Sequence, residues 1–89
     1  MKSRTTERFR NAFVRLPANV QEQARRAFQI WRRTPYHPSL QFKRIHARDP
    51  IYAVRIGIHW RAVAVMRDEA AVWFWIGPHS EYEALVSRL

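Results

Sequence analysis

Two arginines set among apolar residues are the first candidates for a chemical role in this sequence. Arg55 lies in the run Ile51–Ile56, and Arg61 opens the next run. If both face the open side of a sheet, two guanidinium groups lie on adjacent strands, which suits a phosphate or a pentacoordinate phosphorane. An unpaired buried guanidinium is very costly, so these side chains must reach solvent, a partner or a ligand. The alternative is an internal ion pair between Arg61 and Asp68, Glu69 or a terminal carboxylate.

A histidine and a tyrosine follow near the C-terminus. His79 immediately precedes Ser80, the expected cap of a short helix, and the start of a helix favours an anion. An imidazole in that position is suited to general acid or base catalysis on a phosphate group. Tyr82 lies one turn further on and is suited to stacking on a base. The alternatives are a loop histidine bonded to backbone and a tyrosine that packs on the sheet.

A basic pair, Lys43-Arg44, precedes these residues in the chain and resembles a phosphate grip on the first strand of the sheet. A solvated charge on an edge strand is the alternative explanation. No metal or other cofactor is expected, because the sequence has no cysteine and no clustered carboxylates, and its histidines lack helical i, i+4 spacing. With two glycines there is no Gly-rich nucleotide loop. The histidines are His37, His46, His59 and His79.

The composition predicts one small basic domain spanning residues 1–89. The formal charge is +9, and all of the 16 basic residues except Lys2 and Lys43 are arginine. Such a balance attracts nucleic acid or an acidic protein, although a GC-rich genome also enriches arginine. The absence of cysteine, of a signal peptide and of a long apolar run predicts a soluble cytoplasmic protein with no membrane contact.

The elements that must position these residues begin with an antiparallel meander. Three apolar runs, Ile51–Ile56, Arg61–Met66 and Ala71–Ile76, are separated by short polar or Gly-containing breaks. The last run is apolar on both faces, which predicts a strand that is covered from both sides. The segment Ser39–His46 is predicted as the first strand, with irregular alternation that suggests a bulge. Met1–Thr6 is expected as either a short edge strand or a frayed tail.

Helical stripes flank this sheet. Phe9, Ala12, Phe13 and Leu16 repeat at helical spacing until Pro17, and a second stripe follows an expected capping box at Asn19 and Glu22. A further capping box at Ser80 and Glu83 opens the C-terminal helix, with Gly77-Pro78 ending the strand before it. The predicted fold class is therefore α+β, with two N-terminal helices packed on a four-stranded antiparallel sheet and a short C-terminal helix.

Together these features resemble the RelE/ParE superfamily of toxins from type II toxin–antitoxin systems, in particular its RelE/YafQ-like branch. The resemblance covers nearly the whole chain and is carried by the order and spacing of several motifs. These are LPANVQEQARRAF, HPSLQFKRIH, YAVRIGIHWRAV and VWFWIGPHSEY, with Tyr52-x-x-Arg55 and Trp60-Arg61-Ala62-Val63 on consecutive strands.

The resemblance implies a ribosome-dependent, metal-free mRNA endonuclease in which the ribose 2′-OH attacks its own phosphate. Arg61 stands where the family carries an active-site arginine, and His79 where YafQ-like members carry a catalytic histidine. Tyr82 is near the place of a base-stacking aromatic residue. Lys43, Arg44 and Arg55 are expected to hold the RNA backbone. The histidine-and-aspartate set of YafQ-like enzymes is matched at His79, and His46 or His59 is a looser match to its other histidine.

The same resemblance implies a partner and leaves two other functions open. An acidic, largely disordered antitoxin is expected to fold on the helices or a sheet edge, to neutralise Lys43 and Arg61, and to mediate a higher oligomer. The alternatives to mRNA cleavage are inhibition of DNA gyrase, as in ParE-like members, and RNA binding without catalysis.

Overall fold

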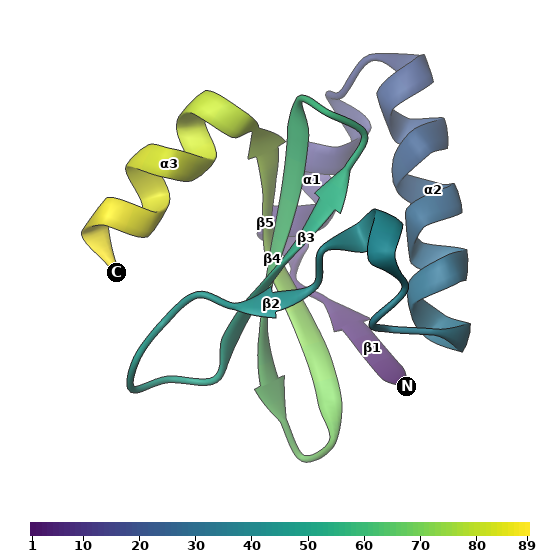
Figure 1. Ribbon diagram of the computed structural model, residues 1–89. Coiled ribbons are helices and arrows are strands. Elements are labelled where there is room, and N and C mark those ends of the chain that lie inside the picture. The colour runs from purple at the N-terminus through teal and green to yellow at the C-terminus, as the bar shows by residue number, and fades with distance from the viewer.

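A twisted five-stranded sheet forms the centre of the computed structural model, which describes residues 1–89 (Figure 1). Along the sheet the strands run in the order β1-β5-β4-β3-β2. The neighbouring strands from β5 to β2 are antiparallel, and β1 pairs with β5 in parallel. The strands are β1 (Lys2–Thr5), β2 (Lys43–Arg44), β3 (Ile51–Ile56), β4 (Trp60–Arg67) and β5 (Ala70–Pro78).

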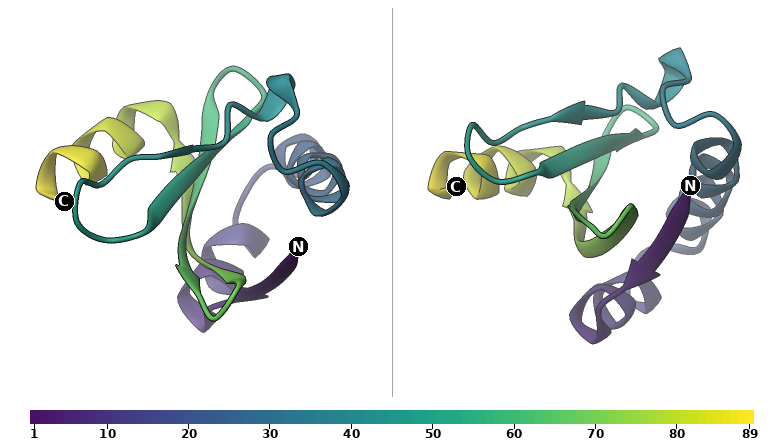
Figure 2. Two further views of the ribbon diagram at one scale, coloured as in Figure 1. Left: turned by 60° about the horizontal axis from the view of Figure 1, so that its bottom comes forward. Right: turned by 90° about the horizontal axis from the view of Figure 1, so that it is seen from below.

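Helices cover both faces of this sheet. The helices α1 (Glu7–Val14) and α2 (Ala18–Arg33) lie on one face, and α3 (His79–Arg88) extends on the other side (Figure 2). The predicted α+β class is confirmed, and the N-terminal segment forms the strand that was one of its two expected states. That strand makes the sheet mixed and five-stranded. No helix has the length and apolar character needed to span a membrane.

The predicted first helix is confirmed, whereas both predicted capping boxes are wrong. Thr6 caps α1, since its Oγ1 accepts a hydrogen bond from the Phe9 backbone N–H at 3.1 Å. The other two helices begin directly after Pro17 and Pro78 and have no side-chain cap. Both prolines are the N-cap residues, with extended ψ values of 147° and 157°, so each helix begins two residues earlier than the predicted capping box would place it.

The main core lies between the sheet and the two N-terminal helices. Trp31 of α2 and Trp73 of β5 are fully buried there, with ring centroids 5.3 Å apart in an edge-to-face arrangement. A smaller cluster around Ile51, Ala53 and Val63 lies on the other face, where Tyr82 and other residues of α3 pack. The prediction that the last strand is covered from both sides is therefore confirmed.

The predicted strand Ser39–His46 is mostly wrong. Residues Pro38–Leu40 form a short 3-10 helix (η1), and only Lys43 and Arg44 pair with β3. Phe42 packs in the main core whereas Ile45 packs on the cluster of the other face, so the odd spacing of these apolar residues reflects burial on opposite faces and no bulge is present in β2. Because β2 pairs only with the first half of β3, the second half of β3 has no strand on its outer side.

Candidate functional site

Arg55 and Arg61 lie directly opposite each other on β3 and β4, next to the hairpin that joins these strands. Arg55 Nε donates to the Gly57 carbonyl at 3.0 Å. Arg61 Nη1 donates to the carbonyls of Trp60 at 2.8 Å and Ile58 at 3.3 Å. Neither arginine forms an ion pair in this structure. Backbone carbonyls therefore orient the two guanidinium groups and leave their charge uncompensated.

This arrangement changes the pKa of Arg61. Partial burial lowers the pKa of Arg61 from its ordinary value, and the positive charge of Arg55 lowers it further, while Tyr82 acts in the opposite direction. Arginine stays protonated in proteins at all ordinary pH values, so the lowered pKa does not discharge it. Instead, two cations held close together at a half-buried position make a local potential that favours an anion such as a phosphodiester.

Tyr82 forms a wall of the same site from α3. Its half-buried ring lies 6.4 Å from the Trp75 ring and 6.0 Å from the His79 ring, measured between centroids. Burial raises the pKa of Tyr82, and the nearby Arg61 offsets part of that rise. The phenol is therefore neutral at physiological pH and lies within the electrostatic reach of Arg61.

His79 is the first residue of α3, which therefore begins two residues earlier than a cap at Ser80 would place it. Its backbone N–H donates to the His59 carbonyl at 2.7 Å, which fixes the start of α3 against the β3–β4 hairpin. The His79 Nε2 atom lies 3.5 Å from Glu83 Oε1, one turn along the helix, and both side chains are substantially exposed. The imidazole is thus positioned by the helix and remains open to solvent beside Tyr82.

The two residues of the basic pair point to different sides of the sheet. Lys43 lies opposite Ala53, whose side chain belongs to the α3 face, whereas Arg44 lies opposite Tyr52, which packs on the main core. Arg44 donates to the carbonyls of His46 and Arg48, both at 3.0 Å. The structure therefore places Lys43 on the face of Arg61 and gives Arg44 a role in ordering the loop before β3.

The structure also separates the two further histidines. His46 lies at the far end of α3, where its Nε2 is 3.0 Å from the Leu89 carbonyl and its Nδ1 accepts two backbone N–H bonds. His59 instead lies in the hairpin that bonds to His79. Pairing of Trp60 with Pro78 brings this hairpin to the start of α3, so the meander register could have identified His59.

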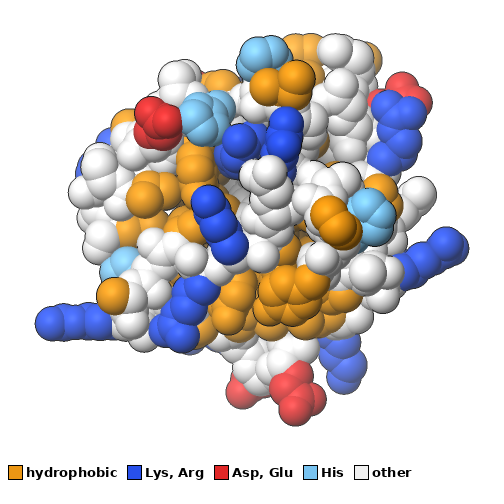
Figure 3. Space-filling view, in the orientation of Figure 1, with side chains coloured by type: hydrophobic (Ala, Val, Ile, Leu, Met, Phe, Trp, Pro, Cys, Tyr) orange, Lys and Arg blue, Asp and Glu red, His pale blue; other side chains and the backbone are white.

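Basic and histidine side chains gather on the upper part of the face shown in Figure 3, over the hairpin end of the sheet and the start of α3. Apolar surface adjoins them on the same face. No group of three or more His, Cys, Asp or Glu side chains comes together in a way that could hold a metal ion. The arrangement offers an anion-binding arginine pair, an exposed imidazole and an aromatic wall.

A family model matches most of this chain. Residues 18–84 match the family model described as the ParE-like toxin domain. This match covers α2, the whole meander and the first half of α3. No curated protein sequence matches the chain.

Solved structures share the fold at low sequence identity. A chain of the RelB–RelE antitoxin–toxin complex from Methanococcus jannaschii superposes with a TM-score of 0.73 at 10% identity, covering 92% of this chain and 96% of that one. YafQ from E. coli gives 0.70 at 8% identity, with coverages of 91% and 96%. The isolated E. coli RelE toxin gives 0.65 at 18% identity, with coverages of 99% and 98%.

Proposed function

This chain belongs to the ParE-like toxin family, and we propose that it is the toxin of a type II toxin–antitoxin pair that cleaves mRNA in the ribosomal A site. The observation that carries the proposal is the placement of Arg55, Arg61, His79 and Tyr82 at one end of the sheet, on the face where α3 packs. The fold shared with RelE and YafQ supports it.

The proposed reaction is an internal transesterification of RNA. The ribose 2′-oxygen forms a bond to the adjacent phosphorus and loses its proton to a base, while the bond from phosphorus to the 5′-oxygen breaks and an acid protonates that oxygen. The products are a 2′,3′-cyclic phosphate and a free 5′-hydroxyl. Negative charge increases on the non-bridging oxygens in the phosphorane, so a preorganised cation close to them lowers the barrier.

Each residue has a proposed role in that reaction. Arg61 stabilises the phosphorane, since hairpin carbonyls already orient its guanidinium. His79 transfers a proton as general acid or base, because its imidazole is exposed at the start of α3. Tyr82 stacks on a base next to the cleaved bond. Lys43 and Arg55 hold the RNA backbone, and Arg44 contributes through long-range charge.

The second part of the proposal is a protein partner. We propose an acidic antitoxin, because a chain with a charge of +9 and an exposed arginine-rich surface attracts a flexible acidic protein. Two of the similar solved structures are described as toxin–antitoxin complexes, RelB–RelE from Methanococcus jannaschii and RelBE from E. coli, and a third is the RelE–RelB complex from Pyrococcus horikoshii. Association through such a partner into a higher oligomer is part of the same proposal.

Induction of the chain in a bacterial host, followed by primer-extension mapping of transcripts, tests the proposal. We expect growth arrest with new transcript ends inside translated regions. Arg61→Ala and His79→Ala are each expected to reduce cleavage about 100-fold or more, in the range for one electrostatic or acid–base group. Arg48→Ala is the matched control, since Arg48 lies in the loop before β3, and it should cleave like the wild type.

Two other results would assign another function. Growth arrest with intact mRNA and DNA-damage signalling indicates a gyrase inhibitor, which the description of the family as ParE-like makes the second candidate. Normal growth with retained, salt-dependent RNA binding indicates a non-catalytic RNA-binding module. Full toxicity and cleavage in both Arg61→Ala and His79→Ala would show that these residues lack the proposed roles.

A further inference from the structure

A pocket outside the candidate site lies between α1 and α3, at the edge of the sheet. The strand β1 pairs with β5 only along Ala70–Trp73, because the chain leaves the sheet at Thr6 to form α1. The following residues of β5 therefore have no strand on their outer side, and a pocket of about 410 Å³ lies there. Small-molecule pockets in proteins have volumes of about 300–1,000 Å³, so this one is large enough to hold a ligand.

Aromatic and cationic side chains line this pocket. Phe74 and Trp75 of β5 form its floor and are half-buried. Arg8 and Arg15 line the α1 side and Arg88 lines the α3 side, and all three are exposed. None of these arginines forms an ion pair. Aromatic rings in a positively charged groove are typical of sites for single-stranded nucleic acid, because bases stack on the rings and phosphates meet the cations.

Trp75 links this pocket to the candidate site. Its ring lies directly over Gly77, since a Cβ atom at Gly77 would be 2.8 Å from Cζ2 of the indole. Gly77 in turn pairs with Arg61 on β4. The Trp75 ring also lies 6.4 Å from the Tyr82 ring, measured between centroids. One indole therefore borders both the pocket and the residues proposed to act on the cleaved phosphate.

We infer that this pocket, called here the α1–α3 pocket, binds a further nucleotide of the RNA strand that is cleaved, beyond the base that stacks on Tyr82. The inference rests on the proposed function for the identity of that strand. The base of the nucleotide stacks on Trp75, and its phosphate meets Arg15 and Arg88. The continuity of the Trp75 ring with the candidate site favours the cleaved strand over a separate RNA.

Glu81 distinguishes a base from an acidic protein side chain as the occupant. It is the one acidic residue that lines the α1–α3 pocket. A carboxylate repels the Asp and Glu side chains of an acidic protein, because like charges oppose association. The same carboxylate accepts a hydrogen bond from the exocyclic amino group of a base such as cytosine. The pocket therefore combines cations for a phosphate with an acceptor for a neutral base.

Titration of the full chain with two single-stranded 2′-O-methyl oligocytidylates tests this inference. The 2′-methyl group blocks the proposed attack, so binding is measured without cleavage. The short probe is a trinucleotide, which is sufficient for the candidate site, and the long probe has about eight nucleotides, enough to reach the α1–α3 pocket as well. We expect the long probe to bind at least about tenfold more tightly, because it adds a stacked base and phosphate contacts.

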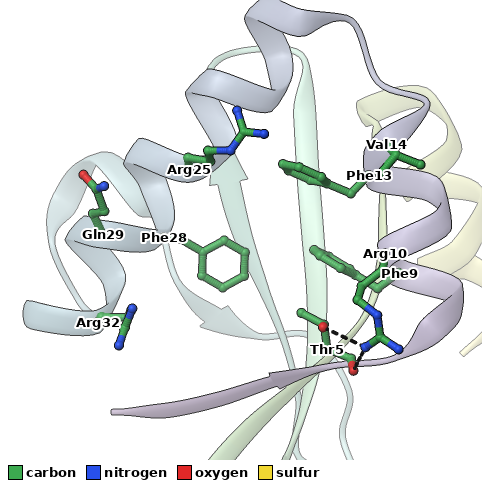
Figure 4. Close-up of a pocket in the computed structure, with 9 residues that line it drawn as sticks. All are labelled: Thr5, Phe9, Arg10, Phe13, Val14, Arg25, Phe28, Gln29 and Arg32. Atoms are coloured by element: carbon green, nitrogen blue, oxygen red, sulfur yellow. Dashed lines mark hydrogen bonds between the residues drawn. The ribbon is translucent and has the colours of Figure 1, made fainter.

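Variants then locate the binding surface. Trp75→Leu and Arg15→Ala should each weaken binding of the long probe about fivefold or more and that of the trinucleotide less than about twofold. Arg25→Ala is the matched control, because Arg25 lines a groove between α1 and α2 (Figure 4), and it should weaken both probes less than about twofold. Thermal unfolding shows whether each variant is folded, and Arg15 is exposed, so Arg15→Ala keeps the test decisive if Trp75→Leu does not fold.

Three results would overturn the inference. The first is a long probe that binds no more tightly than the trinucleotide. The second is an equal loss of affinity for the long probe in Arg15→Ala and Arg25→Ala. The third is a Glu-rich peptide that loses as much affinity in Trp75→Leu as the long probe does, since such a peptide has no ring to stack and its loss would indicate a protein ligand.

Photo-crosslinking on translating ribosomes identifies the strand. With 4-thiouridine at single positions of the mRNA, we expect an adduct on the peptide that contains Phe74 and Trp75, at one fixed distance from the cleaved bond. An adduct formed only with ribosomal RNA would overturn the assignment to the cleaved strand. A chain that binds the long probe through Trp75 and Arg15 but never cleaves RNA refutes the proposed reaction and leaves the α1–α3 pocket as an RNA-binding site.

Discussion

At the scale of single residues, the candidate site depends on how its charges are held. Arg55 and Arg61 bond to carbonyls of the hairpin between them, so the backbone orients the guanidinium groups without neutralising them. Gly57 makes this hairpin possible, because it adopts a positive φ of 59°. A Cβ atom at that position would also lie 2.8 Å from Gln23 Oε1. The geometry of the arginine pair therefore depends on one glycine as well as on the arginines.

Tyr82 gives a pH-dependent prediction at the same scale. Burial raises the pKa of Tyr82 above the value of about 10 in the unfolded chain, with Arg61 offsetting part of the rise. The folded state thus holds the phenolic proton more tightly, so the stabilisation is present below about pH 10 and is lost as the pH rises through the folded pKa. Tyr82→Phe should flatten this alkaline loss of unfolding free energy.

Urea unfolding of both proteins between about pH 8 and pH 11 measures that difference, because the two proteins differ only in the hydroxyl group of residue 82. Tyr36→Phe removes a tyrosine that is 66% exposed and is the matched control. An alkaline loss as steep in Tyr82→Phe as in the wild type would contradict the assignment.

At the scale of elements, β5 organises the molecule. It pairs with β1 on one side and β4 on the other, and its two faces contribute to two different clusters. An irregularity opposite Val63 and Ala64 leaves Phe74 without a partner on β4, so Trp73 faces the main core while Phe74 and Trp75 both reach the α3 side. The apolar sequence of β5 alone predicted burial on both of its faces. The register shift depends on how β5 pairs with β4, so it could not be predicted from that sequence.

The turn between β4 and β5 gives a stability prediction. Asp68 and Glu69 both have positive φ, at 50° and 64°, which non-glycine residues rarely adopt. Glycine takes that conformation without a steric penalty. Glu69→Gly should therefore raise the free energy of unfolding by about 0.5–1 kcal/mol.

The matched control places glycine where it should have the opposite effect. Ala84 is exposed in the middle of α3, and Ala84→Gly should lower the free energy of unfolding by about 1 kcal/mol. Chemical denaturation of the two variants and the wild type checks both signs. A loss of stability in Glu69→Gly would show that the turn is held by contacts other than its backbone conformation.

At the scale of the whole molecule, positive charge lies on both faces of one thin sheet. The arginine pair with His79 and Tyr82 lies on the α3 face, and Arg10, Arg25 and Arg32 line an open groove between α1 and α2. Arginine is present on both, so the net charge of +9 attracts polyanions to the entire surface. Neighbouring apolar and aromatic side chains distinguish the two surfaces.

A salt titration tests whether the charge acts as proposed on RNA. Binding to a single-stranded RNA should weaken linearly on a plot of log affinity against log salt concentration, because each phosphate contact releases counterions. Arg61→Ala should reduce the slope by about 0.7, the value for one contact with a single strand. Arg25→Ala, the matched change on α2 at the opposite face of the sheet, should leave the slope within about 0.3 of the wild type. Equal slopes for Arg61→Ala and the wild type would argue against an Arg61–phosphate contact.

The sequence determined the meander, the first helix stripe and the side-by-side placement of Arg55 and Arg61, because strand and helix periodicities are local properties. The capping boxes at Asn19 and Ser80 failed because neighbouring prolines already set the helix starts. The strand predicted over residues 39–46 is mostly absent because Pro38–Leu40 form a 3-10 helix and Gln41 has a left-handed backbone, so pairing begins only at Lys43.

Only the tertiary structure decided which charged residues share a site. Lys43 and Arg44 are adjacent in the chain, yet pairing with β3 sends them to opposite faces. His46 and His59 looked equivalent, yet β4–β5 pairing brings only the His59 hairpin to the start of α3. Local sequence cannot encode these outcomes, because they depend on strand register and on which neighbour each strand acquires on folding.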